Sequence, residues 1–304
     1  MQTFARKMRT LFVLGSINSD LVMGVNHFPV PGETTLAKNF AKFQGGKGAN
    51  VAVISARHGC PVRMIGAVGT DPSGSEAVQN LEKEGINSSG IQKVRDSSTG
   101  TALVLVDDVG DNRIIVAPGA NNDLDHSLAL LELESMGPGD ALVAQFEVPV
   151  SLVEKALKAA KQRGSLTVLN PSPFQIPSSE LLRSTDILVC NEIEFGQLKS
   201  AFKSEDLEKL ISNAIVTKGS EGVHLLKGNK NVTEFQAPVV EAVDTTGAGD
   251  AFLGAFCAQL IEEKSLENSI KSAILVAAST VSKAGAQASY PSVADIEILK
   301  RAVL

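Results

Sequence analysis

The segment VDTTGAGDAF, residues 243–252, places Gly247, Gly249 and Asp250 at an expected loop-to-helix junction. Because glycine allows positive φ and close approach, the amides of Ala248, Gly249 and Asp250 can point at one anion. The positive end of the helix dipole adds to this attraction. An aspartate there opposes anion binding unless it accepts a proton beside a phosphate, as the catalytic base of a kinase does. The segment therefore indicates phosphoryl transfer, although the same residues would also form a helix start that Asp250 simply caps.

Two further polar clusters suit a ligand with hydroxyl groups. Lys47 and Asn50 follow two glycines before a predicted helix and supply hydrogen-bond donors and an acceptor. Asn18 and Asp20 follow the first apolar run, at the edge where open α/β sheets bind ligands. They alternate along a strand, so they face the same side, and a carboxylate beside an amide suits a vicinal diol. Each cluster alone predicts only a turn, but beside the aspartate of the first segment they predict a substrate site.

Several other chemistries lack their motifs. There is no G-x-x-x-x-G-K-[ST] run for a P-loop nucleotidase and no G-x-S-x-G nucleophile elbow. The glycines after residue 246 are spaced G-x-G-x-x-x-x-G and come late in the chain, which disfavours a dinucleotide site. The histidines have no metal-ligand spacing, so we expect surface or hydrogen-bonded core residues at His27, His58, His126 and His224.

Composition narrows the partners. The chain has 304 residues, a net charge of −6 and no tryptophan, so it lacks the basic footprint of a nucleic-acid-binding protein. No apolar run reaches the roughly 18 residues of a membrane helix, so we expect no membrane partner. Cys60, Cys190 and Cys257 are scattered within apolar segments, which predicts reduced core thiols and a cytoplasmic protein. Because the net charge is negative, any phosphate must be held by local features.

The elements that must position these residues follow an alternating pattern. Short apolar runs alternate with helical stretches, which predicts an α/β fold with a doubly wound, mostly parallel sheet and helices on both faces. The runs cover residues 11–17, 62–68, 141–146, 166–169, 187–190 and 214–217. A capping box at Ser151 and Glu154 opens a helix that Gly164 ends. Further helices are predicted over residues 247–264, 266–283 and 292–302.

Two segments break this pattern. Residues 18–43 are half polar and contain prolines, and residues 97–117 form a predicted hairpin with its turn at 108–111. No helix is available to cover them. We expect a small separate sheet that acts as a lid, inserted twice into an α/β core of residues 1–17, 44–96 and 118–304.

These motifs together resemble the phosphofructokinase-B-type carbohydrate kinases. The resemblance rests on DTTGAGD at 244–250, on GGKGAN at 45–50 and on GAVGTD at 66–71 with Gly74, and it extends over nearly the whole chain. The form of GKGAN together with NSD at 18–20 is typical of the ribokinase group. The resemblance implies ATP-dependent phosphorylation of ribose at its 5-hydroxyl. Deoxyribose, fructose or adenosine as acceptor, and a non-catalytic sugar- or nucleotide-binding regulator, are the alternatives.

The resemblance also implies residue roles. Asp250 would be the base, an anion hole would form at Ala248, Gly249 and Asp250, and Gly247 would belong to the same catalytic segment. The sugar would contact Asn18, Asp20, Gly46, Lys47, Asn50, Glu147 and Asp250. ATP would contact Asn191, Glu194, Thr217, Lys218, Gly219, Ser220, Glu221, Gly222 and Gly249, with Mg²⁺ near Asn191 and Glu194. The run 217–222 also fits a hairpin turn between strands. A monovalent cation, K⁺, would take mostly carbonyl ligands from Asp244, Thr246, Thr280, Lys283, Gly285 and Ser289. A homodimer through the lid is implied as well.

Overall fold

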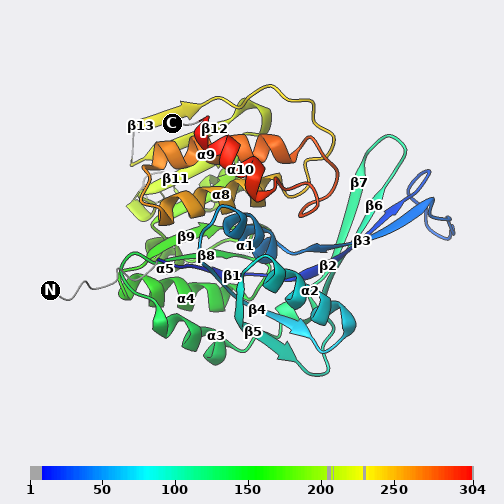
Figure 1. Ribbon diagram of the computed structural model, residues 1–304, viewed down its shortest axis with the longest axis horizontal. Coiled ribbons are helices and arrows are strands. Elements are labelled where there is room, and N and C mark those ends of the chain that lie inside the picture. The colour runs from blue at the N-terminus through cyan, green and yellow to red at the C-terminus, as the bar shows by residue number, and fades with distance from the viewer. Residues whose placement is uncertain (1–8, 204–206, 208, 229–230, 303–304) are drawn as a thin grey trace.

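The computed structural model describes residues 9–203, 207, 209–228 and 231–302. Among these residues, nine strands form one large sheet in the order β13-β12-β11-β10-β9-β8-β1-β4-β5 (Figure 1). The strands from β11 to β5 are parallel, and β12 and β13 add an antiparallel edge. The predicted doubly wound α/β fold is therefore confirmed. The first eight residues of the expected core segment lie outside the described residues.

The strands of the large sheet are β1 (Leu11–Leu14), β4 (Val62–Gly69), β5 (Asn87–Val94), β8 (Ala141–Gln145), β9 (Leu166–Asn170), β10 (Ile187–Asn191), β11 (Asn213–Thr217), β12 (Val223–Lys227) and β13 (Asn231–Phe235). The helices are α1 (Lys47–Arg57), α2 (Pro72–Lys83), α3 (His126–Glu132), α4 (Val150–Gln162), α5 (Ser179–Arg183), α6 (Glu192–Ala201), α8 (Ala248–Ile261), α9 (Leu266–Thr280) and α10 (Val293–Arg301).

Alternation along the central strands divides the core between the two faces. In β1, Leu11 and Val13 pack into one apolar cluster, while Phe12 and Leu14 pack into the other. The first cluster takes its helical residues from α1, α2, α8, α9 and α10, and the second from α3, α4, α5 and α6. Figure 1 shows α8 to α10 on one side of the sheet and α3 to α5 on the other. Both faces of the sheet are covered, which explains the continuous apolar runs.

Close packing of α1 against α8 brings two distant motifs together. A Cβ at Gly254 would overlap the side chain of Ile54 and lie 2.8 Å from the carbonyl oxygen of Val51. The Ser55 hydroxyl donates to the Gly254 carbonyl at 2.9 Å. Glycine therefore lets the two helices approach closely, and their first turns meet where Asn50 donates to Asp250.

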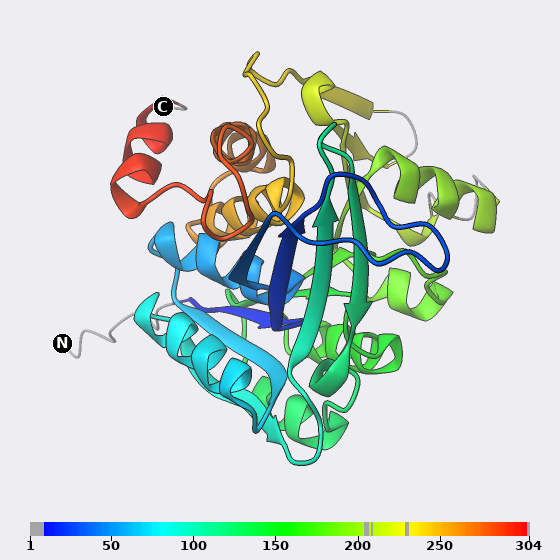
Figure 2. The ribbon, with the colours of Figure 1, turned by 90° about the vertical axis from the view of Figure 1, so that its right-hand side faces the viewer.

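A second, smaller sheet projects from the body of the molecule (Figures 1 and 2). Its order is β3-β2-β6-β7, with β2 (Asn18–Gly24), β3 (Asn39–Gly45), β6 (Gly100–Val106) and β7 (Asn112–Ala117). The pair β2–β6 is parallel and the other two pairs are antiparallel. The expected hairpin is confirmed as β6 and β7. Every residue of β7 is exposed, so this strand is an open edge.

Several local expectations need correction. The first strand ends at Leu14 instead of continuing to residue 17, and α9 ends at Thr280. Ser151 does not cap α4, because the helix begins at Val150 and its N-cap is Pro149. The Glu154 carboxylate instead accepts a 2.5 Å hydrogen bond from Ser178. The predicted helix stop at Gly164 is confirmed by its φ of +74°.

His58 also differs from its expectation. The residue follows α1 and is only 1% exposed, yet neither ring nitrogen has a hydrogen-bond partner among the described residues. Burial, followed by the nearby charge of Lys300, lowers the pKa of His58 to about 3. It is therefore a neutral core residue without hydrogen bonds from its ring. The expectation of buried thiols is confirmed for the three cysteines. Within the described parts of the chain, we find no helix with the length and apolarity to cross a membrane.

Candidate active site

The start of α8 is a glycine-capped helix N-terminus with open space beside it. Gly247 is its N-cap, with a left-handed φ of 77°. A Cβ there would lie 2.8 Å from the Tyr290 hydroxyl, which itself donates to the Gly247 carbonyl at 3.1 Å. The first amides of a helix have no partner inside the helix, and here Ala248 donates at 3.2 Å to the Thr245 carbonyl. Around Gly249 a Cβ would meet nothing within 4 Å, so space lies beside this helix start.

The Asp250 carboxylate lies in this first turn and is only 6% exposed. Asn50 donates to its Oδ2 atom at 2.9 Å, and the Lys47 ammonium lies 3.6 Å from Oδ1. The charge of Asp250 raises the pKa of Lys47 against the effect of burial, and the charges of Glu147 and Glu194 raise it further. Lys47 therefore stays positively charged beside the buried carboxylate. The two motifs, 200 residues apart in sequence, form one charged cluster.

A second carboxylate, that of the partly buried Asp20 on β2, lies near this cluster. Its Oδ1 atom is buried without a hydrogen-bond partner among the described residues. Burial raises the pKa of Asp20 to about 6, and the nearby charges of Glu147 and Asp250 contribute. A buried carboxylate oxygen without a hydrogen-bond partner is costly unless a ligand satisfies it. Asp20 therefore indicates that hydroxyl groups of a ligand belong here.

The other residues that were expected to bind the sugar lie around Asp20. Asn18 is buried, and its Oδ1 atom accepts a 2.7 Å hydrogen bond from Asn121. Gly46 packs so closely that a Cβ there would lie 2.7 Å from the Asn18 amide nitrogen. Glu147, just beyond β8, accepts hydrogen bonds from the Ser16 hydroxyl and, at 3.3 Å, from the Lys47 amide. All of the expected sugar-site residues therefore lie around the edge where the central strands end.

The nucleotide candidates lie farther along the same edge. Asn191 ends β10 directly beside Thr217, which ends β11. Asn191 and Glu194 form a capping box at the start of α6, with bonds of 2.8 and 3.0 Å. Glu194 is buried, and its charge reaches Lys47. This electrostatic interaction connects the two parts of the candidate site.

The expected turn between β11 and β12 is confirmed as the short 3₁₀ turn η3 (Gly219–Glu221). Its contacts are local, because Lys218 pairs with Glu221 at 2.8 Å and its amide donates to the Gly222 carbonyl. Ser220 is exposed. None of these contacts joins the turn to the Asp250 cluster. The turn shares the strand edge with Asn191 but presents separate polar groups there.

The six expected cation ligands come from two segments that lie together. The amides of Val243 and Asp244 donate to the Val281 carbonyl at 2.8 and 3.2 Å. The Asp244 carboxylate accepts 2.8 Å bonds from the amides of Thr246 and Gly285. Partial burial raises the pKa of Asp244, but these hydrogen bonds outweigh burial and hold it below its usual value.

The other members of that set differ in exposure. Thr280 and Ser289 are buried, and the Ser289 hydroxyl donates to the Ala286 carbonyl at 2.8 Å. The Lys283 side chain is exposed, while its amide donates to the Thr280 carbonyl at 3.3 Å. The region therefore offers backbone oxygens and one carboxylate, with its lysine ammonium turned to solvent.

Sequence reasoning missed three polar residues in this region. Asn121 connects to Asn18, Tyr290 to Gly247, and Gln287 to Asn50. Asn121 could have been noticed in the GAN run that follows β7, where the chain returns from the small sheet. Gln287 stands in a segment that was expected to supply only backbone carbonyls to a cation. Nothing in the sequence around Tyr290 indicates its contact.

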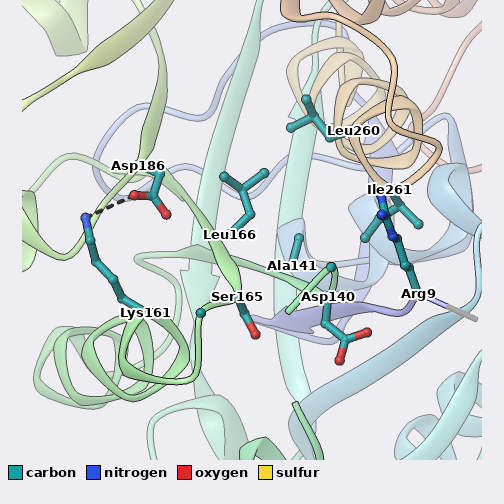
Figure 3. Close-up of a pocket in the computed structure, with 11 residues that line it drawn as sticks. Arg9, Asp140, Ala141, Lys161, Ser165, Leu166, Asp186, Leu260 and Ile261 are labelled. Atoms are coloured by element: carbon teal, nitrogen blue, oxygen red, sulfur yellow. Dashed lines mark ion pairs between the residues drawn. The ribbon is translucent and has the colours of Figure 1, made fainter. Parts of the chain in front are cut away.

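A surface pocket at the opposite edge of the sheet is separate from this cluster. It has a volume of about 450 Å³ and lies where β8 and β9 begin, beside Ala141 and Leu166 (Figure 3). Its cationic Lys161 pairs with Asp186 at 3.0 Å. The Asp250 cluster lies where strands end, so this pocket is not part of the candidate active site.

Comparison with known proteins identifies the family of this chain. Residues 8–293 match the pfkB family carbohydrate kinases. The ribokinase of Haemophilus influenzae is 38% identical over 294 residues, which cover 93% of this chain and 96% of that protein. A ribokinase structure from Thermotoga maritima superposes with a TM-score of 0.88 at 34% identity, covering 97% of this chain and 99% of that one. The Arabidopsis thaliana ribokinase complexed with ribose and ATP has a TM-score of 0.84 at 29% identity, covering 96% and 99%. The chain therefore belongs to the pfkB family of carbohydrate kinases.

Proposed function

We propose that this enzyme transfers the terminal phosphoryl group of ATP to the 5-hydroxyl of D-ribose, giving D-ribose 5-phosphate. The observation that carries the proposal is the buried Asp250 carboxylate in the first turn of α8, held by Asn50 at 2.9 Å and facing Lys47. The similarity of this chain to ribokinases, which extends over 93% of its length, supports ribose as the acceptor. The unpaired Asp20 carboxylate supports a substrate that carries neighbouring hydroxyl groups.

In this mechanism Asp250 accepts the proton of the attacking hydroxyl. Asn50 orients the carboxylate through its 2.9 Å hydrogen bond, and Lys47 balances the negative charge. The helix amides of Gly249 and Asp250 would stabilise negative charge on the transferring group, and the Ala248 amide would join them by exchanging its 3.2 Å hydrogen bond to the Thr245 carbonyl for the phosphate. The helix dipole acts in the same direction.

The sugar would be held by the groups around Asp20. The Asp20 carboxylate would accept hydrogen bonds from two ring hydroxyls, which removes the cost of its buried unpaired oxygen. The remaining contacts with the sugar would come from Asn18, Gly46, Lys47, Asn50 and Glu147. Asn121 donates to Asn18 Oδ1, so the Asn18 amide group is left free to donate to the sugar.

For the nucleotide we propose the edge formed by Asn191, Glu194, the turn 217–222 and Gly249. No group of three acidic, histidine or cysteine side chains suited to a metal occurs among the described residues. The Asn191 and Glu194 side chains fit a Mg²⁺ ion that is held mainly by ATP phosphates and water, with Glu194 nearby, as is usual for this ion. When bound, Mg²⁺ would neutralise phosphate charge.

We further propose that a monovalent cation, K⁺, binds beside Asp244. The donor set fits such an ion because it consists of backbone oxygens near an ionised carboxylate. The carbonyls would come from Asp244, Thr246, Thr280, Lys283, Gly285 and Ser289. A bound cation would add positive charge near the first turn of α8.

We propose that the small sheet, within residues 18–43 and 97–117, is a lid on the core 1–17, 44–96 and 118–304. Closing it would exclude water from the phosphoryl transfer.

The face of this sheet opposite Asp20 carries a row of paired apolar residues, Leu21, Leu103 and Ile115, and Ile115 is 66% exposed. We propose a homodimer through this face. In a sedimentation experiment, Ile115→Lys should have a smaller mass than the wild type. The control variant Ile298→Lys should keep the wild-type mass. The buried free thiols support a reducing, cytoplasmic location.

The decisive experiment is an ATP-consumption assay with ribose, deoxyribose, fructose and adenosine, with and without K⁺. Ribose should give the highest kcat/KM, and K⁺ should increase it. Asp250→Asn should retain ATP and ribose binding while losing turnover by about two to four orders of magnitude. A strong response to another acceptor without one to ribose would overturn the substrate, and a nearly active Asp250→Asn would overturn the mechanism.

A further inference from the structure

A row of hydrogen-bonded side chains, three of them buried and the last half-buried, extends from the Asp250 carboxylate to Asn80 on α2. Asn50 Nδ2 donates to Asp250 Oδ2 at 2.9 Å, and Gln287 Nε2 donates to Asn50 Oδ1 at 3.0 Å. Asn80 Nδ2 then donates to Gln287 Oε1 at 3.1 Å. The four residues come from α8, α1, the loop after α9, and α2. Four separate parts of the fold therefore meet in one hydrogen-bonded row.

The direction of every bond in this row follows from its first member. An ionised carboxylate only accepts hydrogen bonds, so Asn50 must turn its NH₂ group toward Asp250. The Asn50 carbonyl oxygen then faces Gln287, which must donate, and the Gln287 oxygen is left for Asn80. Hydrogen bonds aligned in this way strengthen one another inside a protein.

Burial makes this orientation stringent. Asn50 is 5% exposed, Gln287 8% and Asp250 6%. Water therefore cannot easily replace a missing partner, and a reversed Asn50 amide would place its oxygen against the carboxylate. The loop that carries Gln287 is itself held, because the Gly285 amide donates to Asp244 Oδ2 at 2.8 Å.

We propose that Gln287 is a positioning residue, which orients the Asp250 carboxylate through Asn50. Asn80 fixes the far end of the Gln287 side chain. This inference rests on the proposed role of Asp250 as the base. It adds a residue that touches neither sugar nor phosphate and that acts only by selecting one orientation of the Asn50 amide.

Two substitutions at the same position separate positioning from packing. Gln287→Met keeps the length of the side chain but cannot donate to Asn50, and we expect kcat to fall by on the order of tenfold to a hundredfold. Gln287→Glu keeps both size and polarity but presents only acceptors to Asn50, so it should lower kcat at least as much. A packing role would instead be rescued by glutamate. Gln92→Met is the matched control, because Gln92 also makes two hydrogen bonds, with Asp125, on β5. It should leave kcat unchanged.

A double-mutant cycle shows whether the effect passes through Asn50. In the Asn50→Ala background, Gln287→Met should change kcat by no more than about twofold, because the contact it acts through is already gone. Losses that multiply would overturn the inference. A wild type that phosphorylates no acceptor would refute the proposed function instead.

A crystal structure of Gln287→Met supplies a readout that needs no activity. We expect the Asn50 amide or the Asp250 carboxylate to leave the orientation in which they share a 2.9 Å bond. An unchanged Asp250–Asn50 pair in that structure would overturn the inference, whatever the substrate proves to be.

Discussion

Asp20→Asn should make the ligand-free enzyme more stable while it weakens sugar binding. The Asp20 carboxylate is partly buried near Glu147 and Asp250, and desolvation together with their charges raises its pKa from the ordinary 3.8 to about 6. At about 1.36 kcal/mol for each pKa unit, ionising it in the folded protein costs up to about 3 kcal/mol. Asparagine has nearly the same shape and carries no charge, so the variant avoids this cost.

The pH dependence of this gain has a definite sign. The folded state holds a proton on Asp20 that the unfolded chain has already lost, so this group destabilises the fold increasingly as the pH rises from 3.8 through about 6. The advantage of Asp20→Asn should therefore be complete at pH 8 and fall to about half at pH 5. For a chain of 304 residues, about 3 kcal/mol corresponds to about 5 °C in Tm.

Thermal melting without ligands at pH 8 and pH 5 measures the stability, and steady-state kinetics measures binding. The KM for the sugar should rise on the order of a hundredfold, because charge-assisted hydrogen bonds to the hydroxyls are lost. Asp71→Asn is the matched control, because hydrogen bonds from Thr99 and Gly74 outweigh burial and lower the pKa of Asp71, so that variant should be less stable. Equal Tm values for wild type and Asp20→Asn at pH 8, or the same gain at both pH values, would refute the reasoning.

Three further predictions follow from named contacts. His58 has a pKa lowered to about 3, so the folded state excludes a proton that the unfolded chain binds below pH 6.5, and stability falls with the pH. His58→Leu should lose about 2 kcal/mol less than wild type between pH 7.5 and pH 5, and parallel melting curves would contradict this. Gly247→Ala should cost about 1–3 kcal/mol in denaturant unfolding because its φ is 77°, whereas Gly249→Ala should not destabilise the helix. Asn121→Leu removes the donor to Asn18 and should raise the sugar KM about tenfold with the ATP KM unchanged; an equal rise in both would speak against it.

The alternation of apolar runs and helices was enough to predict the parallel sheet, its coverage on both faces and the hairpin of β6 and β7. These features depend on local periodicity, which the sequence carries directly. The capping box at Ser151 was wrong because α4 begins at Val150 with Pro149 as its N-cap, and the tertiary contacts of Glu154 differ from those a capping box requires. Glu154 has a competing partner in Ser178, which is 24 residues away in sequence and adjacent only in the fold.

The residue types available for chemistry can also be read from the amino-acid sequence alone: the glycines and aspartate at 247–250, the lysine and asparagine at 47 and 50, and the asparagine and aspartate at 18 and 20. The need for glycine at a left-handed helix cap is local, so a motif records it. Which strand edge these residues share follows from the topology of parallel α/β units.

How these groups act on one another depends on the folded arrangement of the chain. Asn50 meets Asp250 across 200 residues, and the raised pKa of Asp20 depends on burial and on charges from two other elements. The role of Gln287 depends on a hydrogen bond to Asn50 that no spacing in the sequence encodes. Coulomb energy, desolvation and hydrogen bonding depend on distances in space, and the folded chain sets those distances.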